Sequence, residues 1–308
     1  MALTDFERRV LNDFRRRRPP ETPARGEDPD AWLAVGLRLL LELGRMLRGA
    51  RAESRPVGIH RKPDGSVVTD WDLAAEWFAR RWLRQALPDT AFMGEETGGR
   101  MTATRTAAID PIDGSWSFVS RDAAFGVSLA FFAAEETVVG LVLNPSTGEL
   151  AYAAGETGSR LLQLDLFGEG DSGAPLPWPL PEDGDPRPLV NLPPAAGHRP
   201  LARRFKDAWE AGRLRHVKST GGSPALSLLE AAKGRYVYVH PWAAGAAMPW
   251  DLAAGVKLVC SAGGRVVDAD GYAIRPLGHQ GLLVAGIDAA AVTAVRGLLE
   301  EEQLQAEN

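Results

Sequence analysis

Segments typical of strands alternate with segments typical of helices through the second half of this chain, and this alternation limits its fold more than any other feature. The pattern predicts strands near residues 189–192, 216–219, 235–239, 266 and 282, and helices over residues 199–211, 224–232 and from Trp250 onward. Such alternation is typical of a layered α/β domain. We therefore predict that the chain forms one from about residue 189.

The first half combines two helices with further strands. Leu, Val and Met recur at helical spacing over residues 31–51, and a second helix is predicted over residues 73–87, with Asp70 or Asp72 as its candidate N-cap. Strands are predicted at residues 66–69, 91–93, 106–109, 125–132 and 138–143. The strands at 91–93 and 106–109 each run directly into acidic residues. These acids are therefore expected at strand ends.

Two segments without apolar periodicity set the predicted domain limits. Residues 1–30 are rich in Pro, Glu and Arg towards their end and are predicted to form a mobile lead-in. Residues 167–188 are rich in Pro, Gly and acids, which predicts a long surface loop or hinge. We therefore predict an N-terminal α+β metal-binding domain over 31–166 and a C-terminal α/β domain over 189–308 that completes the active site.

The composition argues against several classes of protein. The chain has 308 residues, 45% of them hydrophobic, which is enough for one large core or two smaller ones. A net charge of −5 provides no basic surface for nucleic acid. The N-terminus lacks a signal-peptide pattern, and no apolar run approaches the roughly 18 residues that span a bilayer. We expect a cytoplasmic protein that binds neither nucleic acid nor membrane.

The single cysteine, Cys260, rules out an intramolecular disulfide framework and a cysteine-rich metal site. It follows Val256, Leu258 and Val259 in an apolar stretch. We expect a buried thiol and not a nucleophile.

Four acids stand in three motifs whose chemistry suits a magnesium site. Glu95 follows Gly94, Asp110 and Asp113 belong to Asp110-Pro111-Ile112-Asp113-Gly114-Ser115, and Asp251 follows Trp250. Carboxylates without histidine or thiolate suit Mg²⁺ or Mn²⁺ better than zinc. Asp110 and Asp113 lie three residues apart around a proline, so both side chains and a backbone carbonyl can face one point. That arrangement can bridge two ions.

Backbone N–H groups near these acids can serve a phosphoryl group. Small residues at 253–255 would let the start of a helix approach an anion, and Gly114 and Ser115 offer unhindered backbone donors. Taken singly, Glu95 is more often a solvated loop residue and Asp251 an N-cap. The Asp-Pro-x-Asp-Gly-Ser match, however, arises by chance on the order of once in ten thousand chains of this length. The combination predicts a metal-assisted phosphoryl site.

These motifs, in this order, resemble the inositol monophosphatase-like family of lithium-sensitive, magnesium-dependent phosphatases. The segments 62–72, 144–154 and 219–226 also resemble family motifs, and the similarity covers roughly residues 31–290. The resemblance implies a layered α-β-α-β-α sandwich of the sugar phosphatase type, which combines α+β and α/β features. It also implies two or three Mg²⁺ ions, with Mn²⁺ as a possible substitute, a small phosphorylated substrate and a homodimer.

The resemblance assigns roles by motif position. Glu95, Asp110 and Asp113 would hold the first metal together with the carbonyl of Ile112, and Asp110, Asp113 and Asp251 would hold the second. Asp72 and Ser115 would orient and deprotonate the attacking water, with Glu95 and Lys62 as further catalytic residues. Lys62 is expected at the rim, although an exposed turn lysine is the simpler alternative. The residues expected to bind substrate are Asp113, Gly114, Ser115, Gly222, Ser223 and His240.

Two departures from the family pattern concern the substrate. Ser117 stands where the family usually has asparagine, and His240 lies near the place of an acid that binds a substrate hydroxyl. We expect a phosphomonoesterase for a small polyol or sugar phosphate, with myo-inositol 1-phosphate as the first choice. Fructose 1,6-bisphosphate, histidinol phosphate and 3′-phosphoadenosine 5′-phosphate are alternatives. Two further alternatives belong to other classes of protein. One is a non-catalytic protein that binds a phosphate ligand, and the other is an interaction protein that uses residues 175–188.

Overall fold

The structure is a computed structural model. It describes residues 28–52, 58–63, 65–102, 104–156, 158–166, 173–175, 178–179, 185–193, 199–219, 222–242 and 248–300. All but residues 28–30 of the expected lead-in lie outside this part of the chain. None of the helices in the described part combines the length and the apolarity needed to cross a membrane.

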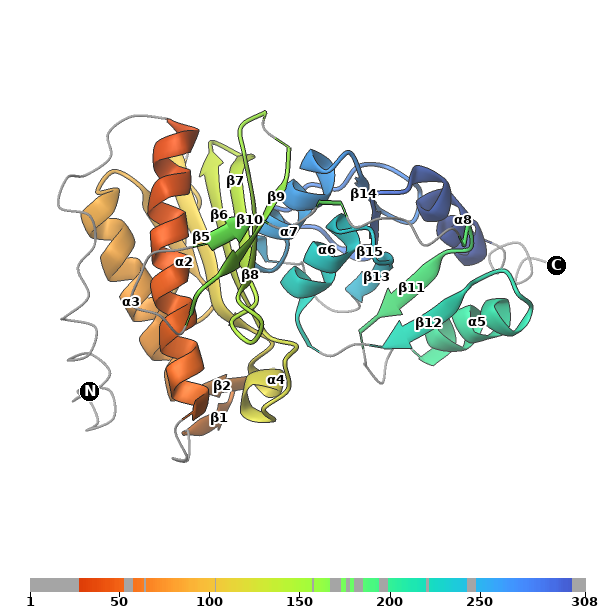
Figure 1. Cartoon of the computed structure of the whole chain (residues 1–308), viewed down its shortest axis with the longest axis horizontal. Coiled ribbons are helices and arrows are strands. Elements are labelled where there is room, and N and C mark those ends of the chain that lie inside the picture. Colours follow the sequence, from red (N-terminus) through yellow and green to blue (C-terminus); the bar gives the residue numbers. More distant parts are fainter. Residues whose placement is uncertain are drawn as a thin grey trace.

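Helices and sheets alternate in five layers (Figure 1). Helices α2 (Pro29–Ala52) and α3 (Asp70–Ala86) cover one face of the first sheet. Helices α6 (Pro224–Ala232) and α7 (Pro249–Ser261) lie between the two sheets. Helices α5 (Arg199–Glu210) and α8 (Ala289–Glu300) cover the outer face of the second sheet. This order of layers confirms the expected α-β-α-β-α sandwich.

The first sheet has the strand order β10-β9-β8-β7-β6-β5-β3-β4. Its strands are β3 (Ala91–Gly94), β4 (Gly98–Gly99), β5 (Arg105–Asp113), β6 (Gly126–Ala133), β7 (Glu136–Leu143), β8 (Glu149–Ala154), β9 (Arg160–Leu164) and β10 (Gly173–Pro175). Neighbouring strands are antiparallel except β3 and β5, which are parallel with Gly94 opposite Ile109. The two strands therefore run to the same edge, where Glu95 follows β3, as the sequence predicts, whereas Asp110 and Asp113 lie in the last part of β5.

The second sheet has the order β12-β11-β13-β15-β14. Its strands are β11 (Leu189–Leu192), β12 (His216–Ser219), β13 (Val237–Trp242), β14 (Arg265–Val267) and β15 (Gly281–Gly286). A separate hairpin joins β1 (Ile59–Arg61) to β2 (Val67–Thr69), and the short helix α4 (Ser115–Val119) lies beside it (Figure 1). Hairpin and α4 frame the site described below.

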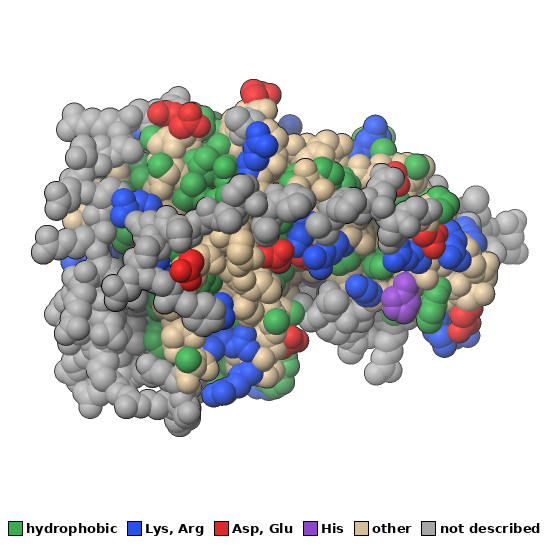
Figure 2. All heavy atoms as spheres, in the orientation of Figure 1, with side chains coloured by type: hydrophobic (Ala, Val, Ile, Leu, Met, Phe, Trp, Pro, Cys, Tyr) green, Lys and Arg blue, Asp and Glu red, His purple; other side chains and the backbone are tan. Residues whose placement is uncertain are grey.

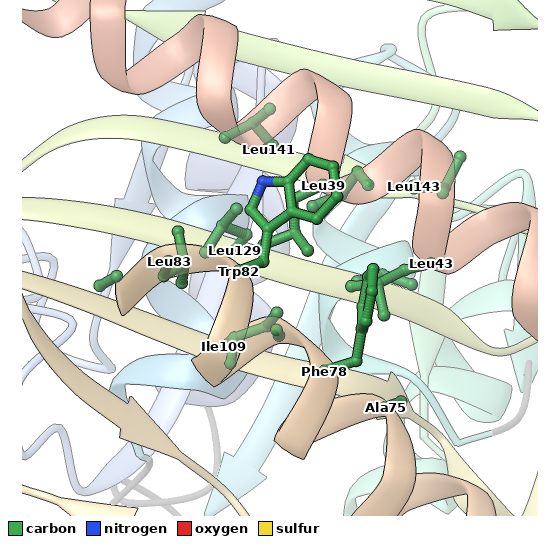
Figure 3. Packing of buried hydrophobic residues seen from close by; sticks show 14 of the residues in the cluster. Leu39, Leu43, Ala75, Phe78, Trp82, Leu83, Ile109, Leu129, Leu141 and Leu143 are labelled. Atoms are coloured by element: carbon green, nitrogen blue, oxygen red, sulfur yellow. The ribbon is translucent and has the colours of Figure 1, made fainter. Parts of the chain in front are cut away.

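The largest apolar cluster joins α2 and α3 to the first sheet (Figure 3). Leu39 and Leu43 of α2 meet Phe78 and Trp82 of α3 above Leu129 of β6, and the two aromatic rings pack with centroids 5.6 Å apart. The burial of these apolar side chains stabilises the packing of the helices on the sheet. It also fixes α3, which carries Asp72, against the sheet at whose edge Glu95, Asp110 and Asp113 lie.

Thr69, and not Asp70 or Asp72, is the N-cap of α3. Its hydroxyl accepts hydrogen bonds from the backbone N–H groups of Trp71 and Asp72, while the Asp72 carboxylate accepts one from the Thr69 N–H. This capping box extends the helix three residues towards the N-terminus relative to the prediction. It also turns the Asp72 side chain back towards the strand that precedes the helix.

The segment 167–188 is not loop throughout. Strand β10 lies within it and pairs antiparallel with β9, so the first sheet continues past the predicted domain limit. A strand of three residues carries too little pattern of its own to be predicted, because its stability depends on the partner strand. The position of the domain boundary itself stays a prediction.

The small residues that follow Asp251 pack against protein and not against an anion. A Cβ on Gly255 would overlap Leu228 of α6, and Ala254 lies against Gly140 of β7. Small side chains allow α7 to lie this close to both neighbours in the middle layer. The expected buried thiol is also wrong: Cys260 is exposed, because the last turn of α7 reaches the surface.

Candidate active site

A pocket of about 530 Å³ opens where the first sheet, the β1–β2 hairpin and the middle-layer helices meet. It is lined by residues from five parts of the chain: Arg61, Gly65, Ser66, Val67, Glu95, Asp110, Asp113, Gly114, Ser115, Trp116, Gly222, Pro224 and Asp251. All four acids predicted as metal ligands line this pocket. Lys62, Asp72, Ile112 and Ser223 bond to them or to Ser115, as described next.

Glu95, Asp110 and Asp251 place carboxylate oxygens within 4.8 Å of one another. Glu95 follows β3, Asp110 ends the regular part of β5, and Asp251 is in the first turn of α7. Burial and the negative charges of Glu95 and Asp113 hold the pKa of Asp110 well above its usual range. Burial and the charge of Glu95 raise the pKa of Asp251 to about 7. Three crowded oxygen donors, of which that of Asp110 is buried and the other two are partly buried, fit a hard divalent cation, which would relieve the repulsion.

Asp113 has a different environment from the other three acids. Its Oδ2 accepts hydrogen bonds from Ser223 Oγ at 2.6 Å and from the Ala225 backbone N–H at 2.7 Å. Burial raises its pKa well above the usual range, although the bond from Ser223 opposes this. Among the described residues it does not join the carboxylate group within 4.8 Å. The structure therefore ties this acid to the start of α6, and its role as a metal ligand stays a prediction.

Asp72 and Ser115 form the hydrogen-bonded pair that the sequence predicts. Ser115 Oγ lies 2.7 Å from Asp72 Oδ1 and 3.3 Å from the Ile112 carbonyl oxygen. The other oxygen of Asp72 accepts from the Thr69 N–H and hydroxyl. Burial raises the pKa of Asp72 to about 6, although the bonds from Thr69 and Ser115 oppose this. A carboxyl group with this pKa can accept a proton near neutral pH.

Lys62 lies inside the site and is not an exposed turn lysine. Its Nζ donates to Glu95 Oε1 at 2.5 Å and to Glu96 Oε1 at 2.8 Å. Burial lowers the pKa of Lys62, but the hydrogen bonds and charges of the two glutamates outweigh this and raise it. Lys62 therefore carries a positive charge that neutralises part of the acidic cluster.

Gly114 and Gly222 bring the two halves of the chain together at the pocket. Gly114 has a φ of +93° and Gly222 a φ of +45°, conformations that favour glycine. A Cβ on Gly114 would lie 3.1 Å from the Ala124 carbonyl oxygen and 3.2 Å from that of Gly222. Glycine at these two positions therefore allows the backbone of the two halves to approach closely beside the pocket.

His240 is a predicted site residue that is not part of the pocket lining. It lies on β13, where its Nδ1 is 2.5 Å from the Tyr238 hydroxyl. Ser117 is buried in α4, and its hydroxyl lies near Gly222. A contact between His240 and the substrate stays a prediction.

Glu76 is a functional candidate that the sequence analysis missed. This fully buried residue of α3 accepts hydrogen bonds from the backbone N–H groups of Glu96 at 2.7 Å and Thr97 at 2.8 Å, and from the Thr97 hydroxyl. It thereby fixes the turn that carries Glu95. Its spacing, one helical turn after Asp72, is the signal that could have revealed it.

Replacing Glu76 by Ala is expected to raise the Mg²⁺ concentration for half-maximal activity tenfold to a hundredfold, on the order seen when residues that orient metal ligands are lost. Two N–H groups and a hydroxyl would lose their acceptor, so the Glu95 turn would move. Glu76→Gln keeps one carbonyl acceptor, so its Mg²⁺ concentration for half-maximal activity should lie between those of the wild-type protein and Glu76→Ala. A lower melting temperature with unchanged Mg²⁺ dependence would show that Glu76 serves stability alone.

The metal-free protein is expected to lose stability as the pH rises from about 5 to about 8. Folding raises the pKa of Asp72 from 3.8 to about 6 and that of Asp251 from 3.8 to about 7. In this window the folded chain binds more protons than the unfolded chain, so the free energy of unfolding falls with rising pH. This loss of stability is complete once the pH exceeds the raised pKa values of Asp72 and Asp251.

Added Mg²⁺ should reverse this trend, because cations bind the deprotonated carboxylates of the folded chain only. Melting temperatures at about pH 5 and about pH 8, each with Mg²⁺ and with chelator, measure both effects. The expectation fails if the metal-free protein melts at the same or a higher temperature at the higher pH.

The chain is similar to known proteins over most of its length. A family model described as the inositol monophosphatase family matches residues 28–302. Inositol-1-monophosphatase from Rhizobium meliloti (strain 1021) is 30% identical over 267 residues, which cover 83% of this chain and 91% of that protein. Nus factor SuhB from Escherichia coli (strain K12) is 27% identical over 276 residues, which cover 87% of this chain and 94% of that protein.

Solved structures show the same fold. The extragenic suppressor protein suhB from Bartonella henselae superposes with a TM-score of 0.71 at 22% identity, over 87% of this chain and 98% of that one. At this identity the likeness concerns the fold alone.

Proposed function

Because this chain belongs to the inositol monophosphatase family and is a phosphoric monoester hydrolase, we propose that it is the Mg²⁺-dependent phosphatase of a small polyol or sugar phosphate. One observation carries the proposal. The carboxylate oxygens of Glu95, Asp110 and Asp251 lie within 4.8 Å of one another in the pocket that Ser115, the partner of Asp72, also lines. The residues proposed to hold the metal and to accept the proton would thus act on a ligand in the same pocket.

Different residues of the chain would bind the metal and orient its ligands. Glu95, Asp110 and Asp251 would hold Mg²⁺, with Asp113 and the Ile112 carbonyl as further ligands and Mn²⁺ as a possible substitute. When bound, the cation would lower the pKa of water and stabilise negative charge on the phosphoryl oxygens. Lys62 would orient Glu95 through the bond at 2.5 Å.

Asp72 would be the final acceptor of the proton from the attacking water. As water attacks phosphorus, its proton passes to Ser115 Oγ while the Ser115 hydroxyl proton passes to Asp72 Oδ1 over 2.7 Å. The bond from phosphorus to the leaving oxygen breaks, and the leaving alkoxide takes a proton from solvent. Backbone N–H groups of Gly114 and Ser115 would orient the phosphoryl oxygens. No covalent phosphoenzyme is required.

The proposal includes one first choice of substrate and three alternatives. myo-Inositol 1-phosphate is the first choice, and Gly222, Ser223 and His240 are the residues proposed to stand near it. Fructose 1,6-bisphosphate, histidinol phosphate and 3′-phosphoadenosine 5′-phosphate are alternatives. A cytoplasmic location and a homodimer belong to the same proposal, and sedimentation of the purified protein tests the dimer.

Phosphate release from these four compounds, measured with Mg²⁺ and with chelator, tests the proposal. Chelator-sensitive turnover of one compound supports the metal mechanism and identifies a substrate. Tight binding of a phosphate ligand without Mg²⁺-dependent release from any compound would instead favour a protein that keeps the fold and binds without catalysis.

A further inference from the structure

A second pocket lies at the opposite end of α7 from the metal site. It has a volume of about 620 Å³, which is within the range of cavities that hold small molecules. Its lining comes from the β6–β7 turn, the last two turns of α7 and the segment 274–277, and it shares no residue with the active-site pocket. Cys260, in this lining, lies roughly 14 Å along the helix axis from Asp251. The second pocket is therefore a separate place in the fold.

Apolar side chains line one part of the second pocket. Val256 of α7 is buried, and Ile274 and Leu277 are half-buried and pack against the apolar cluster of the middle layer. The Ile274 N–H also donates to the Val266 carbonyl oxygen at 3.2 Å, which ties this segment to the second sheet. The apolar part of the pocket is therefore formed by the fold itself, as is usual for sites that bind small molecules.

Thr137 contributes a buried hydroxyl that has no partner. Its Oγ1 is buried and makes no hydrogen bond to any of the residues that the structure describes. Buried polar groups in folded proteins are normally hydrogen-bonded, because leaving one unpaired is unfavourable. Valine has the same shape as threonine and would avoid this cost at a position that needs only packing. The hydroxyl in the lining is therefore available to a ligand.

Two positive and two negative side chains line the same pocket without pairing. Lys257 Nζ donates to the Gly155 carbonyl oxygen at 2.9 Å, and Arg275 is exposed. Glu135 and Glu136 are also exposed, at the β6–β7 turn. Within the described part of the chain, no ion pair joins either cation to either carboxylate. The four charges thus face one space and are not neutralised by one another.

Opposite charges on the rest of the surface do lie together. Acidic and basic side chains are neighbours in several places on the face shown in Figure 2, and Arg187 pairs with Asp185 at 2.8 Å. A ligand with a single charge would be attracted by one pair of side chains in the second pocket and repelled by the other pair. A ligand that carries both a carboxylate and an ammonium group complements both pairs.

We propose that the second pocket binds a small peptide-like zwitterion with an apolar body, such as an apolar amino acid or dipeptide. Its carboxylate binds Arg275 and Lys257, and its ammonium group binds Glu135 and Glu136. The apolar body contacts the buried side of the pocket, and the Thr137 hydroxyl adds a neutral hydrogen bond. This site is independent of the proposed phosphatase activity.

Cys260 gives a direct measure of occupancy, because it lines the second pocket, is exposed and is the only cysteine of the chain. The probes are L-leucine, L-phenylalanine and leucyl-leucine. A probe at ten times its dissociation constant leaves about one protein molecule in eleven unoccupied, so the rate of maleimide addition to Cys260 should fall roughly tenfold. The N-acetyl derivative of the tightest probe lacks the positive charge, and its amide lacks the negative charge. Both should bind roughly tenfold more weakly or worse.

Two substitutions test the groups that bind the ligand. Thr137→Val keeps the shape and removes the hydroxyl, so calorimetry should show about twofold to tenfold weaker binding of the tightest probe. Its melting temperature should not fall, because the hydroxyl has no partner in the free protein. Arg275→Gln should weaken binding roughly tenfold or more. Arg265→Gln is the matched control, since Arg265 is exposed at the start of β14 and outside the lining, and it should leave binding unchanged.

Three results would each overturn the inference. The first is that none of the three probes protects Cys260 or gives binding heat at millimolar concentration. The second is that the N-acetyl derivative and the amide protect Cys260 as well as the zwitterion does. The third is that Arg265→Gln weakens binding as much as Arg275→Gln. None of these measurements uses phosphate release, so a failure here leaves the phosphatase proposal intact.

Discussion

Asp110→Asn is expected to lower Mg²⁺-dependent phosphate release on the order of a thousandfold, because it removes a charged ligand from the centre of the acidic group. Asp110 is buried, and its carboxylate lies within 4.8 Å of those of Glu95 and Asp251. A neutral amide binds a divalent cation more weakly than a carboxylate does. The loss should therefore appear in metal affinity, by calorimetry, as well as in turnover.

The same substitution should raise the melting temperature of the metal-free protein. Burial and the charges of Glu95 and Asp113 raise the pKa of Asp110 well above its usual range, which shows that its charged form is unfavourable there. Asparagine has nearly the same shape, and its carbonyl can still accept the hydrogen bond that the Ile112 N–H donates at 2.9 Å. Removing one charge therefore reduces repulsion without opening a cavity.

Asp89→Asn, at an exposed position in the turn after α3, is the control for the loss of one negative charge. It should change neither turnover nor metal affinity. An Asp110→Asn protein that melts at a higher temperature and has lost turnover combines both expected results. Substantial retained activity in a folded Asp110→Asn protein would refute the proposed site.

Much of the fold was predictable because local patterns agree with the tertiary structure. Strands β11 and β12 and helix α6 have the predicted bounds. Helix α6 begins with Ser223 as N-cap and Pro224 in the first turn, which is a strong local signal. Strands β9 and β10 were not predicted, because each depends on a neighbouring strand for its hydrogen bonds.

The site was predictable where chemistry follows from residue type and order. Glu95, which follows β3, and Asp110, in the last part of β5, lie together because the two strands are parallel. Glu76 was missed because its importance lies in a contact across 20 residues, to the backbone of Glu96. The environment of Asp113 was missed for the same reason, since its partners Ser223 and Ala225 are in the other half of the chain.

Ser115→Ala should lower kcat by roughly a hundredfold to ten-thousandfold, the range for loss of a positioned proton-transfer group. The hydroxyl is the link between the pocket and Asp72 Oδ1, at 2.7 Å. Without it, the attacking water has no route to the proton acceptor. The Ser115 hydroxyl is neutral and the proposed metal ligands are carboxylates, so the Mg²⁺ affinity measured by calorimetry should change little.

This result would separate proton transfer from metal binding, because Asp110→Asn lowers both turnover and Mg²⁺ affinity whereas Ser115→Ala lowers turnover alone. Ser115→Thr is the matched control, since it keeps the hydroxyl at the same position and should retain most of the activity. The fold should survive in both variants, because Thr69 continues to cap α3 through Asp72 whether or not Ser115 has a hydroxyl. An alanine variant as active as the threonine variant would mean that Asp72 takes the proton without Ser115.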